Sequence, residues 1–162
     1  MNNFALHYNS ILLEYNEYIA GVNSWTTWPQ TDLYHGAWDV IPLWLWPEPD
    51  AHDNLKHFPI TSKLINHYFP LHRAAGFSRL RAGTVIHPHC GDDSEGNRNV
   101  HRYHLGIDCP DNNNCALLTR TQVIPWTNGQ GFTFDDHEQH AAINKTDQDR
   151  VILIIDYIPN NK

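Results

Sequence analysis

FSRLRAGTVIHPHCG, residues 77–91, opens the part of the chain that decides the fold. From this stretch to residue 157, short runs rich in β-branched and aromatic residues alternate with turn residues, among them Gly91 and the pair Asn128-Gly129. Runs bounded by such turn chemistry predict β-strands. The predicted strands are residues 77–81, 84–87, 100–107, 115–120, 131–135, 138–143 and 150–157. Strands this short and evenly spaced favour a compact antiparallel double sheet of jelly-roll type.

The residues before this region have helical character. Phe4, Ile11 and Tyr15 recur at spacings of seven and four, which predicts a helix over 3–20 that ends at Gly21. The other predicted segments are a loop at 22–34, a strand at 37–46, a polar loop at 47–57, and a helix at 61–69 capped by Thr61 or Ser62. We expect one domain over 1–162, with a helical part at about 1–70 packed outside a core at about 77–157.

Composition limits the classes of partner. The net charge of −7 disfavours nucleic acid or an anionic membrane, and the 12 His raise the expectation of a metal site. The start of the chain lacks the features of a signal peptide, and no run approaches the ~18 apolar residues of a membrane span, so we expect a cytoplasmic protein without a membrane anchor. Of the three Cys, Cys109 and Cys115 bracket an Asn-rich turn and could pair, although free thiols are favoured in that compartment.

The candidate site residues lie at the ends of predicted strands. His89 lies in IHPHCG, His140 lies in FDDHEQHAAIN, and Arg150 opens the apolar run VILIIDY. An arginine that begins a buried strand needs an anion, because an unpaired buried guanidinium is costly. Two kinds of partner stay open: a carboxylate of the protein, for example Asp135 or Asp136, or a carboxylate of a ligand such as 2-oxoglutarate.

The order of these residues carries a resemblance. A His in a turn, a second His about fifty residues later and an Arg about ten residues after that is the layout of 2-oxoglutarate oxygenases, whose usual iron motif is His-x-Asp/Glu…His. Here Gly91 stands in the carboxylate position. FSRLRAGTVIHPHCG, HRYHLGI, FDDHEQHAAIN and DRVILIIDY, in this order, resemble the aspartyl/asparaginyl β-hydroxylase family, in which two histidines hold the iron. The resemblance is strong over 77–157 and weak over 36–70, and it implies a double-stranded β-helix of cupin-like type.

The resemblance implies a role for each matching residue. His89 and His140 would hold Fe(II). The cosubstrate 2-oxoglutarate would be bound by Arg150, Ser78 and His104. Arg102 would hold a carboxylate of the substrate, and Asp136 would hydrogen-bond iron-bound water. If the motif alignment slipped, His87 or His137 would be the first replacement ligands, whereas a ligand role for Cys90, Asp92 or Asp93 is disfavoured.

The resemblance further implies hydroxylation of an unactivated C–H bond with O2, while 2-oxoglutarate becomes succinate and CO2. Arg102 favours a carboxylate-bearing substrate, such as an Asp or Asn residue of a peptide or a free or carrier-bound amino acid. The alternatives are a lipid acyl-chain 2-hydroxylase of the same family, a cupin-like metal protein without 2-oxoglutarate chemistry, and a catalytically silent binding module.

Overall fold

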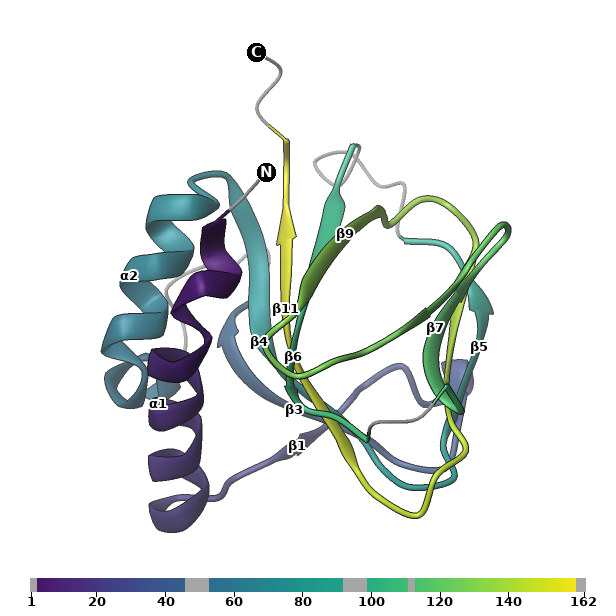
Figure 1. Ribbon diagram of the computed structural model, residues 1–162, viewed down its shortest axis with the longest axis horizontal. Helices are drawn as coiled ribbons and strands as arrows, with labels where there is room; N and C mark the ends of the chain where they lie inside the picture. Colours follow the sequence, from purple (N-terminus) through teal and green to yellow (C-terminus); the bar gives the residue numbers. More distant parts are fainter. Residues whose placement is uncertain (1–2, 46–52, 92–98, 111–112, 160–162) are drawn as a thin grey trace.

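The computed structural model describes residues 3–45, 53–91, 99–110 and 113–159. Over these residues the strands form two sheets that face each other, with all neighbouring strands antiparallel (Figure 1). The six-stranded sheet has the order β1 (Thr26–Thr27), β3 (Trp38–Trp44), β4 (His72–Leu80), β11 (Arg150–Tyr157), β6 (His101–Asp108) and β9 (Gly131–Asp135). The five-stranded sheet has the order β2 (Tyr34–His35), β5 (Val85–His89), β10 (His140–Asn144), β7 (Cys115–Thr119) and β8 (Val123–Pro125).

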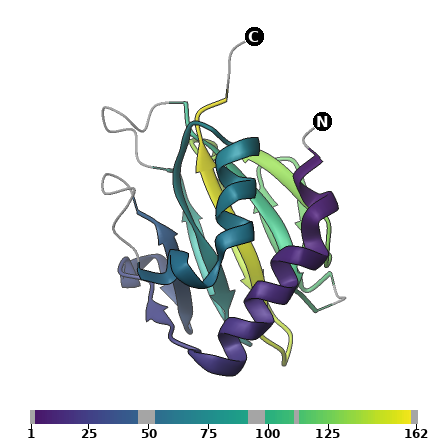
Figure 2. The same cartoon turned by 90° about the vertical axis from the view of Figure 1, so that its left-hand side faces the viewer.

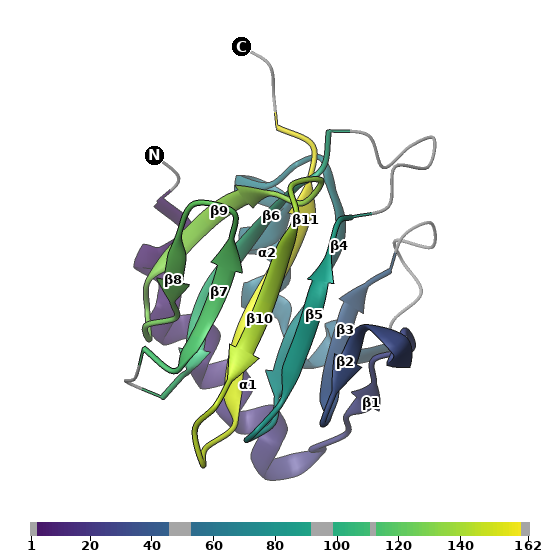
Figure 3. The same cartoon turned by 90° about the vertical axis from the view of Figure 1, so that its right-hand side faces the viewer.

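From β4 onward the chain passes back and forth between the sheets. Strands β4, β6, β9 and β11 belong to the six-stranded sheet, and β5, β7, β8 and β10 belong to the other, where β10 lies between β5 and β7 (Figure 3). This alternation is the topology of a double-stranded β-helix, so the predicted jelly-roll fold is confirmed.

The helices cover one face of the six-stranded sheet, as Figures 1 and 2 show. They are the 3-10 turn η1 (Asn3–His7), α1 (Tyr8–Gly21) and α2 (Pro59–Tyr68). Two further 3-10 turns are η2 (Thr31–Leu33), which contacts β2 and β5 of the other sheet, and η3 (Asp53–His57), which contacts β3 and α2. Ile11 of α1 and Ile65 of α2 belong to one buried cluster with Phe77 and Leu153 of the sheet. The predicted packing of helices outside the sheets is therefore confirmed.

The site lies on the opposite face of the same sheet. Because side chains of a strand alternate between its two faces, Leu153 and Ile155 of β11 join the helical core, whereas Ile152 packs against the core between the sheets. That second core includes Ile86 and Leu117 of the five-stranded sheet.

The predicted start of the second helix is wrong. Helix α2 begins at Pro59, and Phe58 is its N-cap without a side-chain hydrogen bond. Thr61 lies inside the helix. The buried carboxylate of Glu14 on α1 accepts the N–H groups of Ile60 (2.7 Å) and Thr61 (2.8 Å) and the Thr61 hydroxyl (2.7 Å). A carboxylate from a distant helix thus performs the capping that we assigned to a local hydroxyl.

The strand predictions fail where local sequence is least informative. Strand β4 begins at His72 rather than at 77. Ala75 and Gly76 pair with both β3 and β11, and Ala74 pairs with β11, although all three residues have little intrinsic strand preference. The short strands β1, β2 and β8 were not predicted. Strand β10 begins at His140 rather than at 138.

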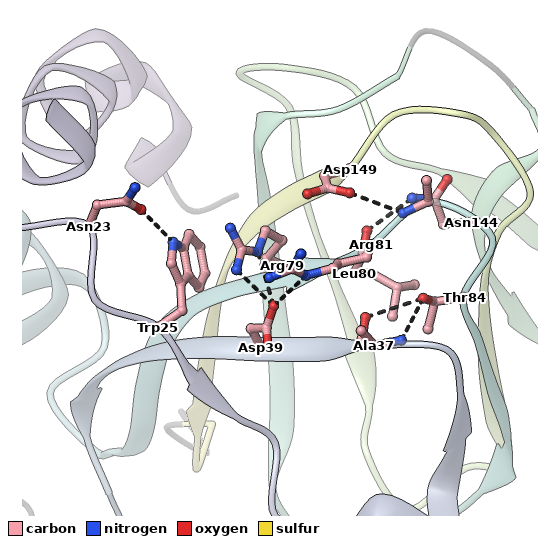
Figure 4. Close-up of polar contacts among 11 residues, drawn as sticks. Asn23, Trp25, Ala37, Asp39, Arg79, Leu80, Arg81, Thr84, Asn144 and Asp149 are labelled. Atoms are coloured by element: carbon pink, nitrogen blue, oxygen red, sulfur yellow. Dashed lines mark hydrogen bonds and ion pairs between the residues drawn. The ribbon is translucent and has the colours of Figure 1, made fainter.

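A charged cluster joins β3 to β4 beside α1 (Figure 4). Asp39 accepts hydrogen bonds from Nε (3.1 Å) and Nη2 (2.8 Å) of Arg79 and from Nε of Arg81 (2.9 Å). The Arg79 guanidinium also lies 4.2 Å from the centre of the Trp25 ring. These contacts hold β3 to β4 near one edge of the sheet. They also give a structural partner to both arginines of the FSRLRAGTVIHPHCG motif.

Two further expectations concern the thiols and the membrane. Cys109 and Cys115 are free, as favoured, and Cys115 is buried. In the described part of the chain, every helix is too short or too polar to cross a membrane.

We expect Glu14→Gln to lower the free energy of unfolding by about 1–3 kcal/mol, because three hydrogen bonds to a buried carboxylate are replaced or lost. Urea unfolding measures this change. Glu17→Gln, a matched change at an exposed position of the same helix, should alter stability by less than about 0.5 kcal/mol. Equal stabilities of the two variants would refute the capping role of Glu14.

Candidate active site

The pairing of β5 with β10 brings the two motif histidines together. His89 and His140 are direct cross-strand partners, and their ring centres lie 4.3 Å apart. The next partners are Ile86 and Ala142, so three residues of β5 span two of β10. This irregularity spans Pro88, which cannot donate a ladder hydrogen bond.

Both imidazoles are held in the same tautomer. The Nδ1 atom of His89 lies 2.8 Å from the carbonyl oxygen of His87, and Nδ1 of His140 lies 2.8 Å from that of Glu138. Because a carbonyl only accepts, Nδ1 carries the proton in each ring and Nε2 keeps a free lone pair. Burial lowers the pKa of His140 to about 4, so this ring stays neutral. Carbonyl-oriented, neutral imidazoles are the form in which histidines bind metal.

The carboxylate of Asp136 occupies the place of the side chain that Gly91 lacks. Gly91 donates its N–H to the Asp136 carbonyl (2.7 Å), and a Cβ on Gly91 would overlap Asp136 Oδ2 and lie 2.8 Å from Cγ. Asp136 Oδ1 lies 3.7 Å from Nε2 of His140. Burial raises the pKa of Asp136 above its ordinary value, and the opposing effect of Arg102 is smaller. The sequence has Gly91 where the usual iron motif has a carboxylate, and the fold places the Asp136 carboxylate in that space.

Arg102 is bound between two carboxylates. Its Nε and Nη2 donate to the two oxygens of Asp156 (2.6 and 2.8 Å), and Nη1 lies 2.9 Å from Oδ1 of Asp136. Arg102 and Asp156 are cross-strand partners on β6 and β11, which explains the bidentate geometry. Burial lowers the pKa of Arg102, but Asp156 and Asp136 outweigh it and raise that pKa above the ordinary value.

Arg150, in contrast, has no carboxylate partner among the described residues. It is 2% exposed, and its Nη1 contacts only the carbonyl (3.3 Å) and the hydroxyl (3.4 Å) of Ser78. The guanidinium lies 4.4 Å from the centre of the Trp126 ring, and its Nε has no hydrogen-bond partner. Burial lowers the pKa of Arg150 to about 10, so the group remains charged at neutral pH.

The two protein partners that we left open for Arg150 are used elsewhere. Asp136 pairs with Arg102, and Asp135 accepts the backbone N–H of His137 (3.0 Å). The alternative in which Asp135 or Asp136 neutralises Arg150 is therefore wrong. Among the described residues no carboxylate neutralises Arg150, which leaves a carboxylate of a ligand as the alternative that the sequence also allowed.

His104 offers a second donor to the same space. Trp126 Nε1 donates to Nδ1 of His104 (3.1 Å), so the proton of the neutral ring is on Nε2, and this buried Nε2 has no partner. Burial, followed by the charge of Arg102, lowers the pKa of His104 well below its ordinary value. The loop that carries Trp126 packs tightly on Gly106, where a Cβ would overlap the Thr127 carbonyl.

Two adjoining cavities connect these groups. A small inner cavity of about 30 Å³ is lined by Ser78, His104 and Arg150 together with both motif histidines. It adjoins an outer cavity of about 630 Å³, which shares His89 and Arg102 with it and is also lined by Asp136. A ligand with one carboxylate at Arg150 and a metal-chelating end near His89 would therefore extend through both cavities. Among the residues that the structure describes, no three His, Cys, Asp or Glu gather into a metal-binding group. The donors present thus fit Fe(II) only as a two-histidine site, with further positions left for ligands.

None of the remaining candidates that the structure describes lines the inner cavity, although Cys90 lines the outer one. His87 and Cys90 are exposed, and His137 accepts the N–H of Val100 (3.4 Å). Asp92 and Asp93 lie outside the described residues.

Sequence reasoning missed three residues of the site. Asp156 was not considered, although its position six residues after Arg150 puts it on the same face of the strand. Trp38 and Trp126 had no local signal. Trp38 donates Nε1 to Ser78 (2.9 Å) and lines both cavities.

Solved structures with the same fold place the chain in a class first. A prolyl-4-hydroxylase from Pseudomonas putida has a TM-score of 0.62 at 12% identity, with 97% of this chain and 88% of that chain covered. A predicted oxalate decarboxylase from Thermotoga maritima has a TM-score of 0.52 at 12% identity, with 84% and 93% covered. At such identities the likeness concerns the fold, and it makes this chain a double-stranded β-helix protein.

The sequence comparisons then give the family. The family model of aspartyl/asparaginyl beta-hydroxylase matches residues 5–159. The ornithine lipid ester-linked acyl 2-hydroxylase of Rhizobium tropici is 32% identical over 109 residues, which are 67% of this chain and 37% of that protein. The chain belongs to the aspartyl/asparaginyl beta-hydroxylase family, a family of hydroxylases, and it spans little more than a third of this relative's length.

We expect Gly91→Ala to displace the Asp136 carboxylate and to lower the free energy of unfolding by about 1–3 kcal/mol, the usual cost of overpacking. Because Asp136 lies beside His140, Mn(II) affinity in a calorimetric titration should also fall. Gly21→Ala adds the same methyl where no atom lies within 4 Å, so it should leave Mn(II) affinity unchanged and should not lower the free energy of unfolding. An unchanged Mn(II) affinity in Gly91→Ala would disprove this role of Asp136.

The two buried imidazoles predict a pH dependence. Burial lowers the pKa of His104 well below 6.5 and that of His140 to about 4, so the unfolded chain binds more protons than the folded protein. Their contribution to stability should be complete above about pH 6.5 and should be lost as the pH falls toward about 4. Urea unfolding of the metal-free protein across this range measures the decline, and His104→Gln should make it shallower. A variant as pH-dependent as the wild type would show that the fold does not keep His104 neutral.

Proposed function

We propose that this protein is an Fe(II)- and 2-oxoglutarate-dependent hydroxylase. The observation that carries the proposal is Arg150, a buried cation without a carboxylate partner in the described part of the chain. A guanidinium in this state costs stability unless an anion binds it. The unpaired Nε2–H of His104 lines the same inner cavity, so two donors are ready for one carboxylate.

One set of residues binds the distal carboxylate of the cosubstrate, and a second set binds the metal that its other end chelates. Arg150, His104 and Ser78 hold the distal carboxylate of 2-oxoglutarate at the base of the inner cavity. His89 and His140 present Nε2 lone pairs to Fe(II). When bound, the metal and its cosubstrate supply the oxidising chemistry, in which O2 converts 2-oxoglutarate to succinate and CO2 and hydroxylates a C–H bond. Asp136 lies beside His140 and adds the negative charge that a two-histidine site lacks.

The surroundings favour this use of the cavity. Trp38, Trp126 and Phe134 line the inner cavity around the polar groups and keep bulk water from them. Ile152 and Ile154 complete this apolar wall. Low solvent access strengthens the pairing between Arg150 and a bound carboxylate.

Two substrate classes differ in the charge that reaches Arg102. The first, which the family motif implies, carries a carboxylate that Arg102 would hold, as in an Asp or Asn residue or a free or carrier-bound amino acid. The second is an acyl chain, the group named in the Rhizobium relative. Both reactions use O2 and insert a hydroxyl group.

Anaerobic addition of Fe(II) and 2-oxoglutarate tests the proposal. We expect a metal-to-ligand charge-transfer band in the visible spectrum, because the 2-oxoacid end chelates the metal. Arg150→Met, which keeps the apolar stem and removes the charge, should weaken 2-oxoglutarate binding by about a hundredfold, as expected for loss of a charge-assisted pair.

The matched control is Arg120→Ala, at an exposed position, which should leave the band and the affinity unchanged. Arg150→Met should also be at least as stable as the wild type, since an uncompensated buried charge is removed. Absence of the band in folded, iron-loaded protein would exclude the oxygenase and favour a cupin-like metal protein without 2-oxoglutarate.

A further inference from the structure

Arg102 lies where three cavities meet. It lines the inner cavity, the outer cavity and a third cavity of about 280 Å³. This third cavity, which we call the β4 groove, is lined by residues of β1, β3 and β4 on the face of the sheet that bears the candidate active site. A substrate that extends from the β4 groove to the inner cavity would therefore pass Arg102.

The β4 groove is built from apolar and small side chains. Its floor is formed by Ala74 and Gly76 of β4, and Trp28, Trp44 and Leu45 stand around it. Small residues on β4 leave room where the neighbouring strands carry larger groups. Arg102 and Asp156 supply the groove's only formal charges among its described lining residues.

The positive charge of Arg102 is neutralised by Asp156, and Asp136 adds a further negative charge. Asp156 holds Nε and Nη2 of Arg102, and Asp136 holds Nη1, so each guanidinium nitrogen already contacts a carboxylate. One cation between two anions has a net charge of −1, which repels a further carboxylate. An uncharged apolar group meets no such opposition, and it covers apolar surface that is otherwise in contact with water.

We propose that the β4 groove binds an uncharged aliphatic segment of the substrate and that Asp156 is the specificity-determining residue, because it neutralises Arg102. The inference rests on the proposed function, whose substrate class it names. Arg102 is then a positioning residue that fixes Asp136 beside His140, in place of the carboxylate anchor that the family motif implies. The chain of contacts from Asp156 through Arg102 to Asp136 links the choice of substrate to the metal side of the site.

A titration with 1-nonanol tests the groove directly, because Trp28 and Trp44 report on it by fluorescence. We expect saturable quenching in the wild type and at least about tenfold weaker binding in Ala74→Leu, which fills the floor. Leu45→Glu changes a 45% exposed residue at the rim, so it should fold normally and also weaken binding. Ala20→Leu on the exposed side of α1 is the matched control and should bind as the wild type does. Unchanged affinity in both groove variants would overturn the assignment.

Comparison of 1-nonanol with nonanoate tests Asp156. The wild type should bind the alcohol more tightly than the anion. Asp156→Asn removes one negative charge with little change in shape, so the preference should shift toward nonanoate by about tenfold or more. If the wild type already prefers nonanoate and Asp156→Asn changes nothing, Arg102 is available to carboxylates and the role of Asp156 is refuted.

The charge-transfer band distinguishes a failure of the groove proposal from a failure of the oxygenase proposal. If Ala74→Leu keeps the band with Fe(II) and 2-oxoglutarate but loses 1-nonanol, the β4 groove is supported as a substrate site distinct from the cosubstrate site. If the band forms and 1-nonanol does not bind the wild type, the groove proposal fails and the oxygenase stands. If no variant or wild-type protein gives the band, the oxygenase fails whatever the groove binds.

Discussion

The two-residue period of β11 is the constraint on which the rest of the structure depends. This strand lies in the middle of the six-stranded sheet, between β4 and β6. Its odd-numbered residues, such as Leu153, enter the core under the helices, while Arg150 and Asp156 belong to the other face with the candidate active site. A shift of one residue in its register would exchange these faces, burying two charges under the helices. Burial of the apolar residues on one face therefore fixes the charged residues on the other.

The arginines differ in how their charge is compensated, and the difference separates structure from function. Arg79 and Arg81 share Asp39 at the sheet edge, and Arg102 lies between Asp136 and Asp156. Arg150 is more deeply buried than any of them and has only Ser78 and an aromatic face. Of these four guanidinium groups, three pair with carboxylates, whereas Arg150 has no carboxylate partner among the described residues, so it carries an energetic cost that a bound anion would remove.

Much of the fold was predictable because its signals are local. Alternating apolar residues and turn residues predicted most strands of the jelly roll, and the helical spacing of Phe4, Ile11 and Tyr15 predicted α1. The errors have a common cause. Strand β4 extends through Ala74 and Gly76 because β11 pairs with both residues and β3 pairs with Gly76, and α2 starts at Pro59 because Glu14 of another helix receives its N–H groups. Neither partner is visible in the local sequence.

The sequence by itself determined the family, the strand pattern and a short set of site candidates, since these depend on residue types and spacings along one chain. The tertiary structure alone decided which candidates meet and what each contacts. It set His89 opposite His140, placed the Asp136 carboxylate in the space beside Gly91, and paired the Arg102 guanidinium with the Asp156 carboxylate. These outcomes depend on the register between strands that are distant in the sequence. Register follows from the packing of whole sheet faces, and no single motif encodes it.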